Sequence, residues 1–162
     1  MTRLLLCFFL FLFPLGAQAN PELARYWGLE ANRLSTQTSD LMHSIDTGQA
    51  LEISDTYVID IHRFGRTSTQ LALWNDRANG PSALGCFFRG LAMDAENSLS
   101  GLEARADLRQ RRESLLQLSA MFSDAQVIAI AAQRRQPASG RVGSLLGANC
   151  VSRIKTSFQS LH

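Results

Sequence analysis

Two histidines and an aspartate are the residues of this chain whose types best suit metal coordination. His43 and Asp46 are three positions apart, so on a helix they share one face and can reach the same ion. His62 is a third candidate, although it follows Asp60 by two positions, which puts those two on different helix faces. A closed metal site usually needs four ligands. The sequence therefore gives His43, Asp46 and His62 as a metal-site hypothesis, against the ordinary alternative of surface residues.

Haem is the second chemistry to consider in a helical chain. Covalent attachment needs a Cys-x-x-Cys-His run, and the stretch 149–153 around Cys150 contains neither a second cysteine nor a histidine. A non-covalent haem held by a histidine together with Met42, Met93 or Met121 stays open, but methionines more commonly fill cores. We therefore expect no cofactor, and a metal- or haem-binding helical bundle is the alternative function.

Nucleophilic catalysis finds no support in the motifs of the chain. The sequence has no Gly-x-Ser-x-Gly elbow and no free cysteine with a nearby histidine. The stretch 140–144 resembles a fragment of a phosphate-binding loop, but it lacks the lysine and the preceding strand of that motif. We interpret it as a linker followed by a helix cap. The absence of a convergent catalytic set predicts a protein that is not an enzyme.

The charged residues are unevenly distributed along the chain. Residues 20–104 carry eleven acids and six bases, whereas residues 105–162 carry nine bases and three acids, and no acid follows Asp124. Such asymmetry marks a docking face for an acidic partner, or it is neutralised where the two halves meet inside the fold. On the first reading, the candidate partner-binding residues are four arginines of the basic half: Arg109, Arg112, Arg134 and Arg135.

The N-terminal residues 1–19 have the three parts of a secretory signal peptide. Arg3 precedes an apolar run from Leu4 to Leu15, and Ala17-Gln18-Ala19 is a small-x-small cleavage site. The run is too short to span a bilayer, which takes about 20 residues, so we expect cleavage near Ala19 and a periplasmic or secreted protein. No further segment is expected to cross a membrane, and an exported chain without an aromatic-interleaved basic stripe is not expected to bind nucleic acid.

Export to an oxidising compartment affects how the cysteines are interpreted. Cys7 is lost with the signal peptide, so Cys86 and Cys150 remain, and two cysteines in an oxidising compartment most simply form a disulfide. The bridge would close a loop of about 64 residues, worth roughly 4 kcal/mol on the loop-entropy model.

Apolar periodicity predicts the elements that position these residues. Stripes at spacings of three and four indicate helices over about 20–48, 55–78, 82–102, 108–135 and 144–161. The stretch 56–61 is β-branched and also fits a strand, but nothing in the chain would pair with it. Ser82 is expected to cap the third helix, and the apolar run 127–132 is expected to be fully buried. Tyr26 and Leu29 lie off the main stripe, which indicates either burial on two sides or a partner surface.

These observations predict one all-α domain over residues 20–162, an up-down bundle of four to five helices with one disulfide. The expected function is that of an exported, non-enzymatic protein that binds a protein partner, in an adaptor, chaperone-like or immunity role. The expected partner is acidic.

Overall fold

The described part of the chain is helical. The computed structural model describes residues 21–102 and 106–134, which form α1 (Pro21–Asp46), α2 (Asp55–Arg77), α3 (Ser82–Ser100) and α4 (Leu108–Arg134). No strand is present in these two ranges, and the β-branched stretch 56–61 lies inside α2. The prediction of an all-α fold is therefore confirmed, and the expected boundaries of the four helices are correct to within about two residues at each described end.

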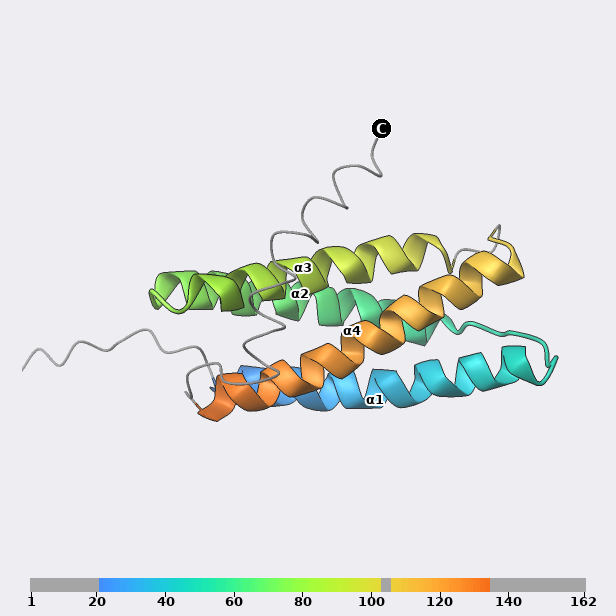
Figure 1. Cartoon of the computed structure of the whole chain (residues 1–162), viewed down its shortest axis with the longest axis horizontal. Helices are drawn as coiled ribbons and strands as arrows, with labels where there is room; N and C mark the ends of the chain where they lie inside the picture. Colours follow the sequence, from blue (N-terminus) through green and yellow to red (C-terminus); the bar gives the residue numbers. More distant parts are fainter. Residues whose placement is uncertain (1–20, 103–105, 135–162) are drawn as a thin grey trace, which may run out of the picture.

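The four helices form an up-down-up-down bundle. Successive helices run in opposite directions, so α1 and α3 point one way and α2 and α4 point the other (Figure 1). The bundle consists of two close pairs: α1 packs chiefly against α4, and α2 packs chiefly against α3. The seams between α1 and α2 and between α3 and α4 are looser, and in the described residues the diagonal pairs meet only through side chains in the core, without close approach of their backbones.

Local sequence signals explain where the helices begin and end. The Ser54 hydroxyl accepts a hydrogen bond from the Tyr57 amide at the start of α2. At the start of α4, the Asp107 carboxylate accepts from the Gln110 amide while the Gln110 side chain accepts from the Asp107 amide, which is a capping box. Gly48 has a positive φ two residues after α1. The prediction for Ser82 was wrong, because Pro81 occupies the N-cap position and Ser82 is already helical.

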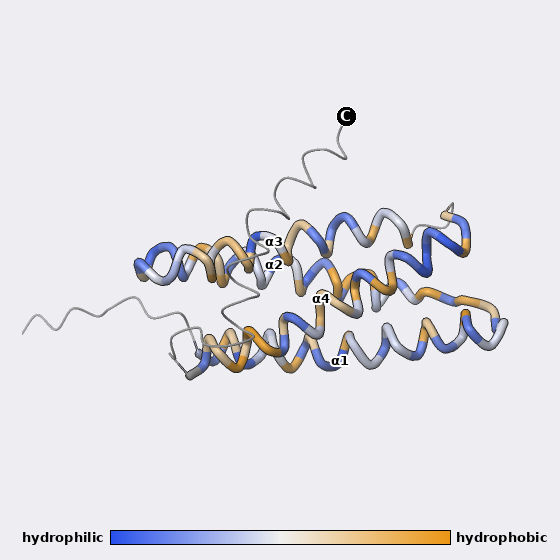
Figure 2. Tube along the Cα trace, viewed as in Figure 1, coloured by the Kyte–Doolittle hydropathy of each residue, from blue (hydrophilic) through white to orange (hydrophobic). Residues whose placement is uncertain are grey.

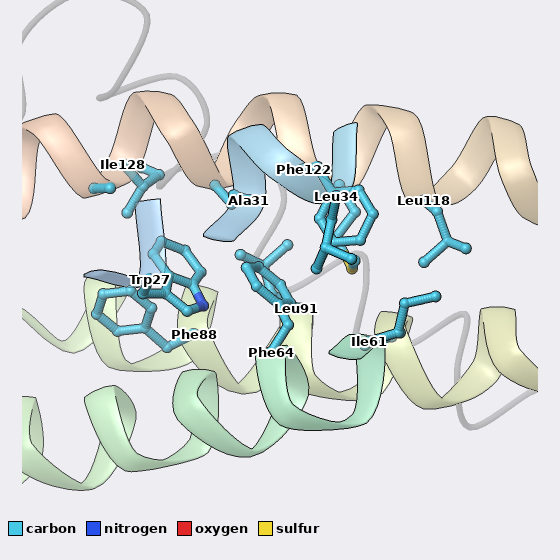
Figure 3. Packing of buried hydrophobic residues seen from close by; sticks show 14 of the residues in the cluster. Trp27, Ala31, Leu34, Ile61, Phe64, Phe88, Leu91, Leu118, Phe122 and Ile128 are labelled. Carbon is cyan, nitrogen blue, oxygen red and sulfur yellow. The ribbon is translucent and has the colours of Figure 1, made fainter. Parts of the chain in front are cut away.

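Aromatic side chains from all four helices meet in the core. The ring of Trp27 on α1 stacks on Phe64 of α2 with centroids 5.1 Å apart and contacts the ring of Phe88 on α3 edge-on at 5.3 Å. Phe64 in turn meets Phe122 of α4 edge-on at 5.2 Å. Figure 3 shows these rings between the helices, with the aliphatic side chains of Leu34, Leu91 and Ile128 filling the space around them.

Small residues account for the closeness of the two tight pairs. A Cβ atom built on Gly28 of α1 would stand 2.6 Å from the Cβ of Ala129 on α4, a distance that real side chains do not adopt. The α2–α3 seam is similar but less tight, since a Cβ on Gly65 would lie 3.4 Å from the Cβ of Ala95. Backbones can approach this closely only where no larger side chain stands between them.

The expectation for the run 127–132 of α4 was wrong in part. Ile128 and Ala129 are buried, but the side chain of Ile130 is 51% exposed and Val127 is half-buried. The error arises because an uninterrupted apolar run still turns through all faces of a helix, and the described helices pack against one side of α4. Figure 2 shows hydrophobic residues along the last turns of α4 and hydrophilic ones at its start. By length and composition α4 is also the single described helix that could cross a membrane, with 39% of the apolar window buried.

Several expectations fall outside the described residues. These are the signal peptide, the loop 136–143, the fifth helix over 144–161 and Cys150. Cys86 is described and lies half-buried in the second turn of α3. The Cys86–Cys150 bridge therefore remains a prediction.

Candidate functional site

A groove between α1 and α2 combines exposed aromatic surface with positive charge. We call it the α1–α2 groove; its volume is about 200 Å³, and eight residues line it: Tyr26, Trp27, Glu30, Arg63, Phe64, Arg66, Thr67 and Gln70. It lies on the looser of the two seams that α1 makes. The loose seam leaves room for a groove where the glycine and alanine seam with α4 does not.

The floor of the groove is rigid. The rings of Trp27 and Phe64 are each 1% exposed and belong to the aromatic core. The Trp27 indole donates to the Ser68 hydroxyl at 2.8 Å, and Ser68 donates onward to the Phe64 carbonyl at 2.9 Å. A buried indole N–H without an acceptor would cost about 1–3 kcal/mol, so this bond holds the ring in one orientation. A partner side chain would therefore meet a preformed surface.

One wall of the groove is an ion-pair network that crosses from α1 to α2. The Arg33 guanidinium binds Asp60 of α2 at 2.6 Å, and it also contacts Glu30 on its own helix. Arg63 reaches the other oxygen of Asp60 at 3.2 Å. The hydrogen bonds that Arg33 donates to Glu30 and to Asp60 raise the pKa of its guanidinium above the ordinary value. The Asp60 carboxylate is 8% exposed, so the two arginines compensate its burial.

The rim of the groove carries the groups that can meet a ligand. Tyr26 is 59% exposed, so much of its ring is accessible to a ligand. Arg66 is exposed and makes no ion pair with an acid in the part of the chain that the structure describes. A guanidinium beside an aromatic ring suits a carboxylate that is attached to an apolar group.

The size of the groove limits what it can hold. Pockets for small molecules and cofactors usually measure about 300–1,000 Å³ and enclose most of the ligand. At about 200 Å³, and open to solvent between two helices, the α1–α2 groove suits one or two side chains of a peptide instead. Its lining provides shape, aromatic surface and positive charge, which are means of binding.

Two further cavities are less suited to ligands of this kind. One, of about 220 Å³, is lined by Gln37, Asp40, Leu41, Ser44, Glu52, Ser54 and Tyr57. The other, of about 280 Å³, lies between the end of α3 and the start of α4 and is lined by Asn97, Ser100, Gly101, Gln110, Glu113, Ser114 and Gln117. Neither contains a basic residue, and neither has an exposed aromatic ring.

The structure separates the predicted metal ligands. Asp46 lies at the last turn of α1 and pairs with Arg112 at 3.4 Å, whereas His62 of α2 faces α3 and contacts Glu96 at 3.0 Å. Because Asp60 contacts Arg33, His62 lies near the level of Arg33, about 15 Å along the bundle from His43. Within residues 21–102 and 106–134, no three potential ligands form a group.

The predicted partner-binding arginines occupy two ends of one helix. Arg109 and Arg112 lie in the first turns of α4, where Arg109 pairs with Glu113 of its own helix at 3.0 Å. Arg134 is the last residue of α4, about 33 Å from Arg112 along the helix axis. Arg135 lies outside the described residues. A single compact partner segment would not touch both ends of α4.

Sequence reasoning identified part of the groove. The position of Tyr26 off the apolar stripe indicated either two-sided burial or a partner surface; the exposed ring excludes the first, and the partner surface remains a prediction. The contribution of Arg63 and Arg66 was missed, because it depends on which face of α2 turns toward α1. The signal available in the sequence was the spacing of three and four that links Arg63 to Arg66 and Thr67, and both of these to Gln70, on one side of the helix.

Comparison of the chain with known protein families, characterised proteins and solved structures finds no match.

Proposed function

We propose that this chain is an exported, non-enzymatic binding protein that takes an acidic protein partner at the α1–α2 groove. The partner segment would place an apolar side chain beside Tyr26, above the buried rings, and an adjacent carboxylate against Arg66. Adaptor, chaperone-like and immunity proteins all work through such contacts.

The observation that carries this proposal is the exposed Tyr26 ring beside a free guanidinium on a rigid floor. Tyrosine and arginine are enriched among residues that dominate binding energy, especially in places where the surface is already ordered. Here Trp27 is fixed by Ser68, and the wall is fixed by Arg33 and Asp60. The groove therefore loses little conformational entropy when a partner binds.

Export and the disulfide belong to the same proposal. The sequence pattern of residues 1–19 supports secretion with cleavage near Ala19, and an oxidising compartment supports a Cys86–Cys150 bridge. The antiparallel course of α3 and α4 also supports the bridge, because α4 ends at the end of the bundle where α3 begins (Figure 1).

A quantitative capture experiment tests the binding proposal. The mature chain is used as bait in an extract of the exported compartment, and proteins that co-purify are quantified by mass spectrometry. The test variant combines Tyr26→Ala with Arg66→Glu, and the matched control combines Leu29→Ala with Arg25→Glu, which are exposed on α1 away from the groove lining. Loss of two such contacts should weaken binding by about 2–4 kcal/mol, or roughly 30- to 1,000-fold.

The control decides how the result is interpreted. A partner lost with the groove variant and retained with the control supports the proposal. A partner retained by both variants, or lost equally from both, places the binding surface elsewhere. Charge reversal at Arg134 and Arg135 then tests the end of α4 as the alternative surface, where slower association and a weaker salt dependence are expected.

A further inference from the structure

The side of the bundle that α3 and α4 share has an apolar surface. Its position follows from the cavity that Asn97 of α3 shares with Gln117 of α4. From these two residues the same sides of the helices continue at helical spacing through seven more residues, three on α3 and four on α4: Met93, Gly90 and Cys86, and Ala120, Asp124, Val127 and Ala131. We call this surface the α3–α4 outer face.

The opposite side of α3 is already occupied, which fixes the orientation of that helix. Arg89 pairs with Asp76 of α2 at 2.7 Å, and Glu96 contacts His62 of α2. On the α3–α4 outer face, by contrast, Met93 is 39% exposed, Ala120 is exposed and a Cβ built on Gly90 would meet nothing within 4 Å. Small residues at Gly90, Ala120 and Ala131 would allow another helix to approach closely.

The residues after α4 have the composition of a helix that fits this face. Leu146, Cys150, Ile154 and Phe158 repeat at a spacing of four and form one apolar stripe. Eight residues, 136–143, precede this stripe and can span about 26 Å when extended. Adjacent helix axes are only about 8–10 Å apart, so this connection is long enough for the chain to turn back beside α4.

The positions of the two cysteines along the bundle axis agree with a fifth helix that runs back beside α4. Cys86 lies four residues after the first residue of α3, and Cys150 lies six residues after Ser144. α4 ends at the end of the bundle where α3 begins (Figure 1), so a helix that started there at Ser144 would run parallel to α3. The two cysteines then differ in height by about 3 Å, which a disulfide can accommodate.

The charged residues support the same placement of the C-terminal segment, independently of the cysteines. The segment after α4 contains Arg153 and Lys155 and no acid. Asp94 and Asp124 are half-buried acids on α3 and α4, on or next to the outer face. Lys155 lies eleven residues after Ser144 and Asp94 lies twelve after Ser82, so the two fall within about 2 Å in height.

We propose that residues 144–161 form a fifth helix seated on the α3–α4 outer face, parallel to α3 and antiparallel to α4. In this position its apolar stripe covers Ala120 and Val127, and its bases face Asp94 and Asp124. The α1–α2 groove lies on another seam of the bundle and stays open, so the inference does not depend on the partner-binding proposal.

Cysteine cross-linking in the full mature chain tests this seat. In a background of Cys86→Ser and Cys150→Ser, Ala120→Cys is combined with Phe158→Cys, which matches the expected height, or with Ile154→Cys, one turn nearer the end of α4. The control joins Ile154→Cys to Ile59→Cys, an exposed position on α2, whose backbone does not come close to that of α4 in the described residues. At least one test pair should oxidise within the monomer about 10-fold faster than the control, because proximity raises the effective concentration of the thiols.

Three results would overturn the inference. Equal rates of disulfide formation for test and control pairs would mean that residues 144–161 do not pack at one position on the bundle. A cross-link between two chains, together with a dimer mass in light scattering, would assign the face to a second copy. Sedimentation of the wild-type chain with phosphatidylcholine–phosphatidylglycerol vesicles, abolished by Met93→Ser, would assign the α3–α4 outer face to a membrane. Peptide mapping of the unreduced wild-type chain separately reports whether Cys86 is joined to Cys150.

Discussion

The two seams that α1 makes differ in what holds them. Against α4, the backbones approach closely where Gly28 stands directly opposite Ala129, and one exposed ion pair, Asp46 with Arg112, lies near the other end of the seam. Against α2, three polar bridges lie along the seam: Trp27 to Ser68, Arg33 to Asp60, and the Thr38 hydroxyl to the Tyr57 hydroxyl at 2.7 Å. The Gly28–Ala129 contact closes the first seam at that level, whereas the bridges of the second keep the helices at a defined height and leave the α1–α2 groove between them.

This difference shows how a small bundle can be both stable and open. Dense packing tolerates little change in volume, because neighbouring atoms have nowhere to move. Polar bridges with long side chains tolerate a wider spacing between helices, and each bridge fixes the register because only one height satisfies its donors and acceptors. The site is therefore expected on the seam that is bridged and not on the seam that is packed.

The largest effect on stability should come from adding a side chain at the packed seam between α1 and α4. Gly28→Val places at least one carbon within the space that Ala129 occupies, so we expect a loss of about 2–4 kcal/mol in the free energy of unfolding, measured by urea denaturation. Gly65→Ala is the matched control, because its Cβ would make an ordinary contact with Ala95. Removing a helical glycine there should stabilise the protein by about 0.5–1 kcal/mol. Equal effects at the two glycines would contradict the packing difference.

The next largest effect is a loss of stability at high pH, which arises at the bridged seam between α1 and α2. Tyr57 is 2% exposed, and burial raises its pKa from 10.0 to about 12. Because Thr38 donates to the Leu34 carbonyl at 2.7 Å, the Tyr57 hydroxyl is left as the donor in its contact with Thr38. The folded state thus keeps the Tyr57 hydroxyl protonated above pH 10, whereas the same hydroxyl loses its proton in the unfolded chain. Stability is complete below pH 10 and should fall by about 2–3 kcal/mol as the pH rises to 12.

The Tyr57→Phe variant isolates this contribution. It should be less stable than the wild type near neutral pH by about 1 kcal/mol, through loss of one hydrogen bond. Its stability should then change less than that of the wild type between pH 10 and pH 12, as followed by circular dichroism. Tyr26→Phe, which alters the exposed tyrosine, should retain the wild-type profile. If Tyr57→Phe retained the wild-type decline as well, burial of the Tyr57 hydroxyl would not be the source of it.

The same contrast explains what the sequence could predict. Helix positions followed from apolar spacing and from breaks such as Asn79-Gly80-Pro81, since these are local features. The stripe of α1 through Trp27, Ala31 and Leu34 was predicted correctly for the same reason. Exposure on α4 was not, because Ile130 and Ile128 are equivalent in a pattern and differ only in which neighbour faces them.

The candidate site was harder to predict because it spans two helices. The contact of Arg33 with Asp60 joins residues 27 positions apart, and no local rule pairs them. The expected partner-binding arginines of α4 were chosen from net charge alone, and charge along a sequence does not report distance in space. Arg112 and Arg134 illustrate this, since they lie at opposite ends of one straight element.

A smaller effect is expected from the ion pairs of the bridged seam. In a double-mutant cycle of Arg33→Met and Asp60→Asn, the coupling free energy should be about 1–2 kcal/mol, because Asp60 is nearly buried. The exposed pair of Arg109 and Glu113 on α4 is the matched comparison, with an expected coupling of about 0.3–0.5 kcal/mol. Coupling energies of the same size would show that the α1–α2 network contributes no more to stability than an ordinary surface pair.

The smallest expected change in stability is at the rim of the groove, and it bears most directly on function. Tyr26 and Arg66 project into solvent, so Tyr26→Ala combined with Arg66→Glu should alter the free energy of unfolding by less than about 0.5 kcal/mol. A residue that adds nothing to folding yet weakens partner capture acts in recognition, whereas a loss above about 1 kcal/mol would make both residues structural. Urea denaturation of the variant beside Leu29→Ala with Arg25→Glu separates the two cases. If the rim is neutral for folding while Trp27 and Asp60 beneath it are not, then the bridged seam holds the groove in place and the exposed rim is available for binding.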